Sequence, residues 1–525
     1  MKKFFAFALA LAMVLSLCAC GGNEPAPTQE QSAGPEITAE TKYADTVIAG
    51  VTADLLSGDP YGDTTPRTEY ITNMTFNTVV YVNPDTGEIE PELAKSWDHN
   101  DDNTEWTFYL QEGVTFVNGD KLTAEDVKFT YEYAANLNGA TNVVKTFTAG
   151  SYAESVEVLD DYTIKFVLKN PMPDFPSYME MKVYSKNAIE TMGHAAGSEI
   201  GTGPYYLDKQ MTVSGQQFVV SRNDNYWENM DPYKTEHIVF KIYGDENALV
   251  AAAQAGEVDF ARLENFAVYN TLDSDPNLTV ETKTGCASYY MCFNYGTKTC
   301  DWNNVELRQA LCQIIDHNAI EAISLEGGVG GTVSHNFCAP SGLGYSANTT
   351  PFEYNPEAGA ATLKAAGVTE LKLIYAASTK KQAEVIQSCL EQAGIHCNIQ
   401  EIDTTNWVTF KAAQDGYDIF TDYCTYRGAL LYNYNRFLYT GGSSNVFGYS
   451  SKEYEAVQDA VSAQTSWEDM LVKFADLQQW VIDNVPIFPL CYANQMQAKL
   501  NSVGGGYMGG AQNADDWSTV YKVVE

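Results

Sequence analysis

The sequence predicts an α/β protein with more than one lobe. Apolar and polar residues alternate with period two in 104–110 ("TEWTFYL") and 162–168 ("YTIKFVL"), which is typical of strands. An amphipathic helical stretch with a glycine stop and then a strand-like run occurs in 247–263 and again in 380–403. Because helices that alternate with strands cover the faces of a sheet, this order indicates α/β lobes. A chain of 525 residues is also too long for one ordinary core, so two or three lobes are expected.

Local signals support individual elements. In the stretch "VNGDKLTAEDV", Asn118 and Gly119 predict a tight turn, because glycine supplies the positive φ that such a turn demands. Thr123 is the expected N-cap of the next helix, with Asp126 three residues further on. The segment therefore reads as a strand, a turn and a capped helix.

The first residues are typical of an export signal. Two lysines precede an apolar run over 4–17, which suits the hydrophobic part of a signal peptide and is short for a membrane span. The following "LCAC" resembles the bacterial lipobox, in which a cysteine becomes the lipidated first residue of the mature protein. Small Ala19 precedes Cys20, so Cys20 is the expected lipidation site. The alternative is a simple secretory signal cleaved nearby.

The segment after the signal predicts a tether. Residues 20–42 are rich in Gly, Pro, Gln and Glu and nearly free of large apolar side chains. Such a segment buries too little surface to order itself. The folded body is therefore expected at the cell membrane, anchored by lipid on the extracytoplasmic face.

Charge and motifs exclude several functional classes. A net charge of −37 repels nucleic-acid phosphates, so nucleic-acid binding is not expected. The chain carries no HExxH, no GxSxG and no complete nucleotide-binding glycine loop, and its histidines are scattered. We therefore expect no metal site, no cofactor and no catalytic residue, which favours a binding protein over an enzyme. Nine of the 11 cysteines follow Cys20; buried thiols are the expectation, with one or two disulfides left open.

Several blocks carry a family resemblance. They read "TGEIEPELAKSW" (86–97), "TFYLQEGVTFVNGDKLTAEDVKFTYEY" (107–133), "GTGPYYL" (201–207), "VVSRNDNYWE" (219–228), "AGEVDF" (255–260), "CFNYGTKTCDWNNVELRQALCQIIDHNAI" (292–320) and "YNPEAGAATLKAAG" (354–367). In this order they resemble the extracellular solute-binding proteins of bacterial ABC transporters, in the large family of oligopeptide-, dipeptide- and nickel-binding proteins. Within these blocks, the glycines of "GTGPYYL" are expected to be structural, and Arg308 is expected to anchor a helix.

The resemblance implies a two-lobed, periplasmic-binding-protein-like fold of type II, with an additional N-terminal domain and a hinged cleft. The chain would cross to the distal lobe near 285–295 and return near 485–495. The expected limits are a signal peptide at 1–19, a tether at 20–42, lobe I at 43–82, 205–288 and 491–525, the additional domain at 83–204, and lobe II at 289–490. Implied partners are an ABC permease and its ATPases, with the chain itself a monomer.

The stretch "YDIFTDYCTYRGALLYNYNR" (417–436) carries the main ligand hypothesis. In peptide-binding relatives, a strand here leads into a cleft loop, W-x-x-D-Y-x-x-P, whose aspartate pairs with the peptide's amino terminus. In this chain Tyr423 stands where the tryptophan would be and Tyr426 where the aspartate would be. Either the alignment slips and Asp422 serves, or the ligand is not an ordinary peptide with a free amino terminus.

The expected strand covers 417–422 and the cleft loop 423–428. Arg427 and Arg436 suit a carboxylate or phosphate, whereas Tyr432 and Tyr434 are expected to cover a sheet face. The predicted ligand-binding residues are Tyr423, Cys424, Thr425, Tyr426, Arg427, Asn77, Trp407 and Tyr492.

The sequence thus predicts the solute-binding subunit of an ABC importer, with a peptide or peptide-like organic solute as ligand. A sugar, an opine-like acid or a nickel chelate remains an alternative ligand. A secreted enzyme or a sensor on the same fold remains an alternative function.

Overall fold

A computed structural model describes residues 35, 37–38, 41–55, 57–62, 66–83, 87–137, 148–340, 342–425, 429–506, 508–509 and 515–524. The predicted lipidation site Cys20 and the predicted ligand residues Tyr426 and Arg427 lie outside these ranges. In the described part of the chain, no helix combines the length and the apolar character that a membrane span requires.

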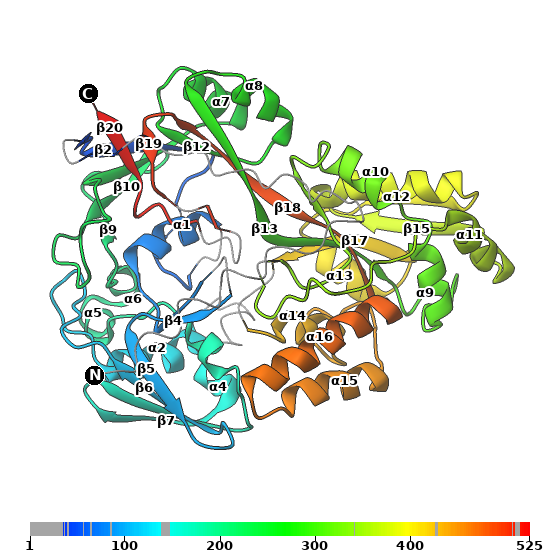
Figure 1. Cartoon of the computed structure of the whole chain (residues 1–525), viewed down its shortest axis with the longest axis horizontal. Coiled ribbons are helices and arrows are strands. Elements are labelled where there is room, and N and C mark those ends of the chain that lie inside the picture. Colours follow the sequence, from blue (N-terminus) through cyan, green and yellow to red (C-terminus); the bar gives the residue numbers. More distant parts are fainter. Residues whose placement is uncertain are drawn as a thin grey trace, which may run out of the picture. The chain divides into compact units, whose positions relative to one another are not determined.

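Two long antiparallel strands form the centre of the main sheet. β13 (Leu278–Phe293) pairs with β18 (Ile487–Leu500), with register shifts between Thr284 and Ser288 and between Tyr289 and Tyr290. The strand order is β16-β15-β17-β13-β18-β12-β2-β11-β10-β9, and β14 (Gly331–Val333) also pairs with β18. The two predicted crossing segments, 285–295 and 485–495, overlap β13 and β18, each extending two residues beyond its strand (Figure 1).

Strands on the β18 side form the first group. They are β2 (Thr46–Val51), β9 (Tyr205–Leu207), β10 (Gln217–Arg222), β11 (His237–Ile242) and β12 (Phe260–Leu263). β2 runs parallel to both β11 and β12, and its residues Val47 and Ala49 are completely buried. The accompanying helices are α1 (Pro66–Thr75), α7 (Glu246–Gln254) and α8 (Tyr269–Asp273). A small separate sheet joins β1 (Lys42–Tyr43), β20 (Tyr521–Val524) and β19 (Val503–Gly504).

A four-stranded antiparallel sheet occupies part of the segment 83–204. Its order is β5 (Ala94–His99), β6 (Glu105–Leu110), β8 (Thr163–Leu168) and β7 (Ala153–Asp160), which confirms the strands predicted at 104–110 and 162–168. A hairpin of β3 (Val80–Val82) and β4 (Ile89–Pro91) accompanies it, with α2 (Ala124–Tyr133), α4 (Ala149–Tyr152), α5 (Lys186–Met192) and α6 (His194–Gly197).

Both local signals in this segment are confirmed. Gly119 has φ of +90° in the predicted turn. At the start of α2, a carboxylate oxygen of Asp126 accepts from the backbone N–H of Thr123 at 2.9 Å and from its hydroxyl at 3.0 Å. This is the acidic version of a capping box, in which a side chain of the first turn satisfies the N-cap backbone.

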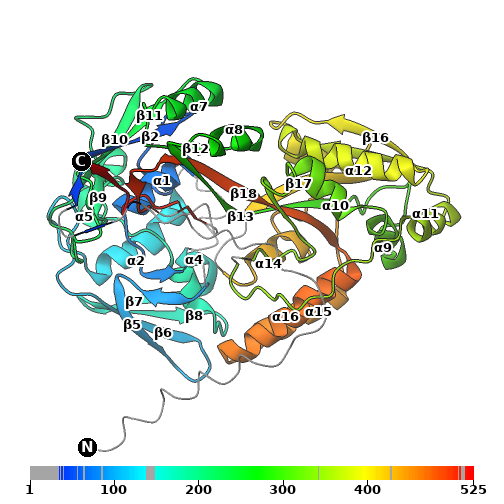
Figure 2. The ribbon, with the colours of Figure 1, turned by 45° about the horizontal axis from the view of Figure 1, so that its top comes forward.

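Strands on the β13 side form the second group. β17 (Ile419–Thr425) and β16 (His396–Glu401) both run parallel to β15 (Glu370–Tyr375). α12 (Lys380–Gln392) lies on one face of these strands, and α14 (Tyr432–Leu438) and α16 (Trp467–Asn484) lie on the other (Figures 1 and 2). Cores on both faces leave the strands covered, as expected for an α/β lobe. The other helices here are α9 (Val305–Cys312), α10 (His317–Ala319), α11 (Pro356–Ala365), α13 (Trp407–Ala413) and α15 (Lys452–Ser462).

Short helical turns complete the described elements. The 3-10 turns are η1 (Ala134–Asn136), η2 (Phe175–Met179), η3 (Phe266–Val268) and η5 (Ala377–Thr379), and η4 (Ile320–Ser324) is a π-helical turn.

Arg308 and the glycines of "GTGPYYL" have the structural roles that the sequence predicted. The Arg308 guanidinium donates to the carbonyl oxygens of Trp302, Asn484 and Val485, so it joins the start of α9 to the end of α16. At Gly203, an added Cβ would lie 2.5 Å from the carbonyl oxygen of Met74 in α1. Glycine is required there because another backbone approaches too closely for any side chain.

Eight cysteines whose side chains the structure describes are thiols outside any disulfide. Seven of these are buried: Cys292, Cys300, Cys312, Cys338, Cys397, Cys424 and Cys491. Cys389 is partly buried. The expectation of buried thiols is confirmed for these positions.

Candidate functional site

The strand β17 is longer than the sequence predicted. It covers Ile419–Thr425 instead of 417–422, so Tyr423, Cys424 and Thr425 are strand residues and do not belong to a loop. The reason is tertiary: all three pair with β13, where Tyr289, Ser288 and Ala287 are their partners. The predicted loop assignment for these three residues is therefore wrong.

Tyr423 and Cys424 point to opposite faces of the sheet, as neighbouring strand residues do. The Tyr423 side chain is 45% exposed. Its ring stacks on Tyr289, with the ring centroids 5.5 Å apart and the planes inclined by 24°. Cys424 is 4% exposed and belongs to the core under α14 and α16. Of the predicted ligand residues in the described part of β17, Tyr423 offers the largest free surface.

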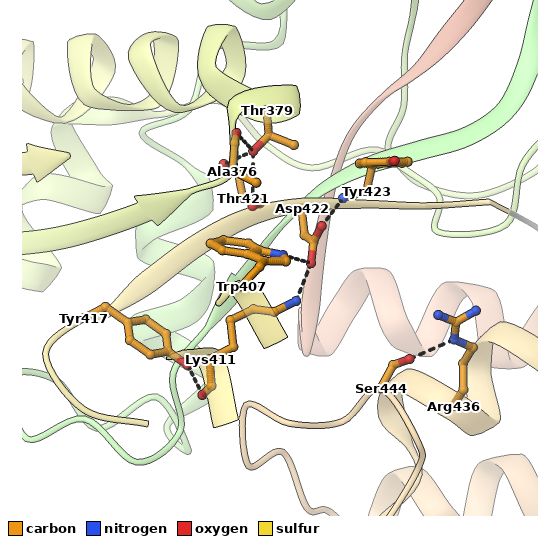
Figure 3. A network of polar contacts seen from close by, with 10 residues as sticks. All are labelled: Ala376, Thr379, Trp407, Lys411, Tyr417, Thr421, Asp422, Tyr423, Arg436 and Ser444. Atoms are coloured by element: carbon orange, nitrogen blue, oxygen red, sulfur yellow. Dashed lines mark hydrogen bonds and ion pairs between the residues drawn. The ribbon is translucent and has the colours of Figure 1, made fainter. Parts of the chain in front are cut away.

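Asp422 is engaged by neighbours within the protein (Figure 3). Its Oδ2 accepts from the Lys411 ammonium and, at 2.9 Å, from the Trp407 indole N–H. Its Oδ1 accepts from the backbone N–H of Tyr423 at 2.9 Å. The Lys411 Nζ also lies 4.8 Å from the Trp407 ring centroid, a cation–π geometry. Both carboxylate oxygens therefore have donors, and the negative charge has a buried cationic partner.

Sequence reasoning singled out Trp407 but missed Lys411. Both stand on α13 four residues apart, so they share one helix face and reach Asp422 together. The available signal was a lysine at this spacing from a tryptophan in a short amphipathic helix. Only packing of α13 against β17 reveals which acid the lysine meets.

Tyr492 is buried, and its hydroxyl lies against the carbonyl oxygens of Asn336 and Cys338. Burial raises the pKa of its phenol well above the ordinary value. Its backbone pairs with Ser288, which also pairs with Cys424. Tyr492, Cys424 and Trp407 thus belong to one core, whereas Tyr423 lies on the opposite face.

Asn77 stands in a different polar network. Its Nδ2 donates to Glu92 at 2.7 Å and to the Tyr226 hydroxyl at 3.2 Å. Its Oδ1 accepts from Thr202 at 3.0 Å and from Trp227 at 3.2 Å. An asparagine amide offers two donor hydrogens and two acceptor positions, and all four are used. None of these four partners belongs to β17.

The two tyrosines after the predicted loop are structural, as expected, whereas Arg436, which the sequence suggested for a carboxylate or phosphate, is engaged within the protein. Tyr432 and Tyr434 are 6% and 0% exposed and belong to the core under α14. The Arg436 Nε donates to Ser444 at 2.9 Å, and its guanidinium lies 4.7 Å from the Phe437 ring centroid. Within the described ranges, no group of three His, Cys, Asp or Glu side chains is arranged to hold a metal ion.

Comparisons with known proteins give a consistent result. Residues 88–445 match the family model described as "Bacterial extracellular solute-binding proteins, family 5 Middle". Heme-binding protein A of Haemophilus influenzae is 26% identical over 461 residues, covering 80% of this chain and 81% of that protein. The Dipeptide-binding protein of Escherichia coli is 27% identical over 378 residues, covering 65% of this chain and 68% of that protein.

A solved structure shows the fold. HbpA2 from Haemophilus parasuis superimposes with a TM-score of 0.80 at 21% identity, covering 91% of this chain and all of that one. The predicted α/β, two-lobed type II fold is confirmed. The limits predicted for the individual domains stay a prediction.

Proposed function

Because the chain belongs to the bacterial extracellular solute-binding proteins of family 5, we propose that it captures a peptide or peptide-like organic solute for an ABC importer. The observation that carries the proposal is the family match over 88–445, supported by relatives named for dipeptide binding. The ligand binds between the two lobes, and its contacts favour the closed form, which a membrane permease recognises. The ligand leaves chemically unchanged, so the protein is not an enzyme.

The ligand contacts Tyr423, and Tyr426 and Arg427 stay ligand contacts predicted from the sequence. Asp422 does not serve as the counter-charge of a ligand ammonium, because Lys411 already occupies that role. Displacing Lys411 would leave a second charge buried and unpaired, which is costly. This favours a ligand that does not depend on Asp422.

A non-peptide ligand is the second candidate. Two observations favour it: the Asp422 carboxylate is already paired with Lys411, and one relative is named for heme binding. A sugar, an opine-like acid or a nickel chelate would then take the place of the peptide.

The chain acts at the outer face of the membrane as a monomer, held by lipid on Cys20. The family is extracellular, and the "LCAC" sequence supplies the lipidation cysteine. A permease and ATPase subunits complete the importer. Cys20→Ala should release the protein from the membrane fraction into the medium, and retention of that variant on the membrane would refute the anchor.

The ligand class is tested by thermal shift on the purified chain. A ligand at 100 times its Kd raises the free energy of unfolding by about 2.7 kcal/mol. We expect small peptides to raise the melting temperature, and oligosaccharides, nickel chelates and opine-like acids to leave it unchanged. A shift with one of the latter classes and none with peptides would replace the first candidate by the second.

A further inference from the structure

The stacked pair of exposed Tyr423 and partly buried Tyr289 interacts electrostatically with one further acid, Glu264. Glu264 directly follows β12, and its side chain has no hydrogen-bond or ion-pair partner within the described ranges; only its backbone N–H is engaged, by Glu246 at 3.0 Å. The residue is exposed. Its carboxylate thus lacks the direct donors that engage Asp422. The Arg262 guanidinium interacts with it electrostatically, but that guanidinium is held by Asp515 at 2.9 Å.

Strand register places Glu264 on the face that carries the tyrosines. Leu263, the last residue of β12, pairs with Met496 of β18, and continuing the same register brings Glu264, the first residue after the strand, to the level of Gln495. Along β18, every second residue from Gln495 leads to Cys491 on the same face. Cys491 pairs with Tyr289, which in turn pairs with Tyr423. Figure 1 shows β12, β18, β13 and β17, the four strands concerned.

The electrostatics agree with this placement. Burial, Asp422 and Glu264 together raise the pKa of the Tyr423 phenol. Burial raises the pKa of Tyr289, with smaller contributions from Cys491, Tyr423 and Glu264. The charge of Glu264 therefore reaches both stacked rings.

We propose that Glu264 determines specificity by receiving a cationic group of the ligand, an ammonium or a guanidinium, which stacks on the exposed face of Tyr423. The inference rests on the proposed function and names the ligand chemistry at this part of the site. A cation between an aromatic face and an unpaired carboxylate gains both a cation–π contact and a charge-assisted hydrogen bond. The pair Lys411 and Asp422 sits on the other face of β17, so it does not compete (Figure 3).

The test measures affinity by calorimetry with two matched pairs of peptides. Ala-Ala-Ala is compared with its N-acetyl form, and Ala-Arg-Ala with the peptide that carries citrulline in place of arginine. Each pair differs by one positive charge. The protein is the full chain in wild-type form and as Glu264→Gln, Tyr423→Leu and Tyr423→Phe.

Glu264→Gln should lower the affinity for the cationic peptide of at least one pair about tenfold, which is the size of a lost charge-assisted hydrogen bond. The affinity for the neutral peptide of that pair should not change. Tyr423→Leu should lower the affinity for the same cationic peptide. Tyr423→Phe should keep that affinity because the aromatic ring remains. Glu257→Gln is the matched control. It removes an exposed acid of the same segment, whose partner Lys241 lies 4.0 Å away, and should change nothing.

Two results would overturn the inference. In the first, wild type binds the peptides, but Glu264→Gln lowers the affinity for neither peptide of a pair or for both equally. Glu264 then does not recognise the ligand's charge, and the proposed function still stands. If wild type binds none of the four peptides, the peptide ligand and the inference fail together. Unchanged circular dichroism and melting temperature establish that each variant is folded.

Discussion

The Lys411 ammonium lies against the Asp422 carboxylate, and the two side chains are only 9% and 13% exposed. The pair joins α13 to β17 in the middle of a stretch otherwise rich in tyrosine. Each charge offsets the free-energy cost of burying the other. Removal of one member therefore leaves the other charge buried at its full cost.

Lys411→Met should therefore lower the free energy of unfolding by about 3 kcal/mol, because it leaves the Asp422 charge buried without its partner. Urea denaturation measures the effect. The double variant Lys411→Met with Asp422→Asn should recover part of the loss. The control is Lys473→Met, which breaks an exposed pair with Asp476 and should cost less than about 1 kcal/mol. Equal losses in the two single variants would contradict the prediction.

Arg308→Met should lower the free energy of unfolding by about 3 kcal/mol, because several buried carbonyl oxygens lose a charged donor. Ligand affinity should not change, since the contacts of Arg308 lie at the ends of α9 and α16. Equilibrium unfolding in urea measures the stability, and titration calorimetry measures the ligand affinity. Arg222→Met, which removes an arginine paired with exposed Asp224, serves as the control. A large loss of affinity in a folded Arg308→Met protein would show that the arginine also serves the ligand.

Gly203→Ala should destabilise the protein by about 2 kcal/mol, the usual cost of forcing extra volume into a packed site. The new methyl group would meet the carbonyl oxygen of Met74 at 2.5 Å, and backbone atoms cannot move aside cheaply. Gly150→Ala adds the same methyl group where no atom lies within 4 Å. The two melting temperatures give the comparison, and a Gly203→Ala protein as stable as Gly150→Ala would refute the close approach.

His317 gives a prediction about pH. Burial and the neighbouring His335, whose ring centroid is 4.3 Å away, lower the pKa of His317 to about 4. The unfolded chain, with a pKa near 6.5, binds the proton more readily than the folded chain. The contribution of neutral His317 to stability is therefore complete above about pH 6.5, falls as the pH drops toward 4, and is lost below it.

His317→Asn should remove this component, which amounts to at most about 3 kcal/mol between pH 6.5 and 4. Urea denaturation at a series of pH values compares the slopes of wild type and variant. His99→Asn, which removes an exposed histidine, is the control variant. Parallel curves for wild type and His317→Asn across this range would mean that His317 does not titrate as described.

Local sequence signals predicted much of the fold, because they depend on residues close together in the chain. The Asn118-Gly119 turn and the Thr123–Asp126 cap each involve a few neighbouring positions, and both formed as expected. The alternating strands in 104–110 and 162–168 were likewise visible from their own side chains.

The candidate site was predicted less well because it depends on distant partners. The end of β17 is set by pairing with Tyr289, Ser288 and Ala287, more than 100 residues earlier. The engagement of Asp422 depends on how α13 packs, and the position of Glu264 depends on the register of β12 and β18. None of these relationships leaves a pattern within a single short stretch of sequence.

The cysteine thiols bear on how the protein matures. Exported proteins commonly rely on thiol oxidation for stability, yet Cys292, Cys312 and Cys338 are almost completely buried as thiols in the cores. For these described positions the native state is reached without an oxidant. Folding at these positions therefore does not depend on whether the cell's exterior is oxidising or reducing.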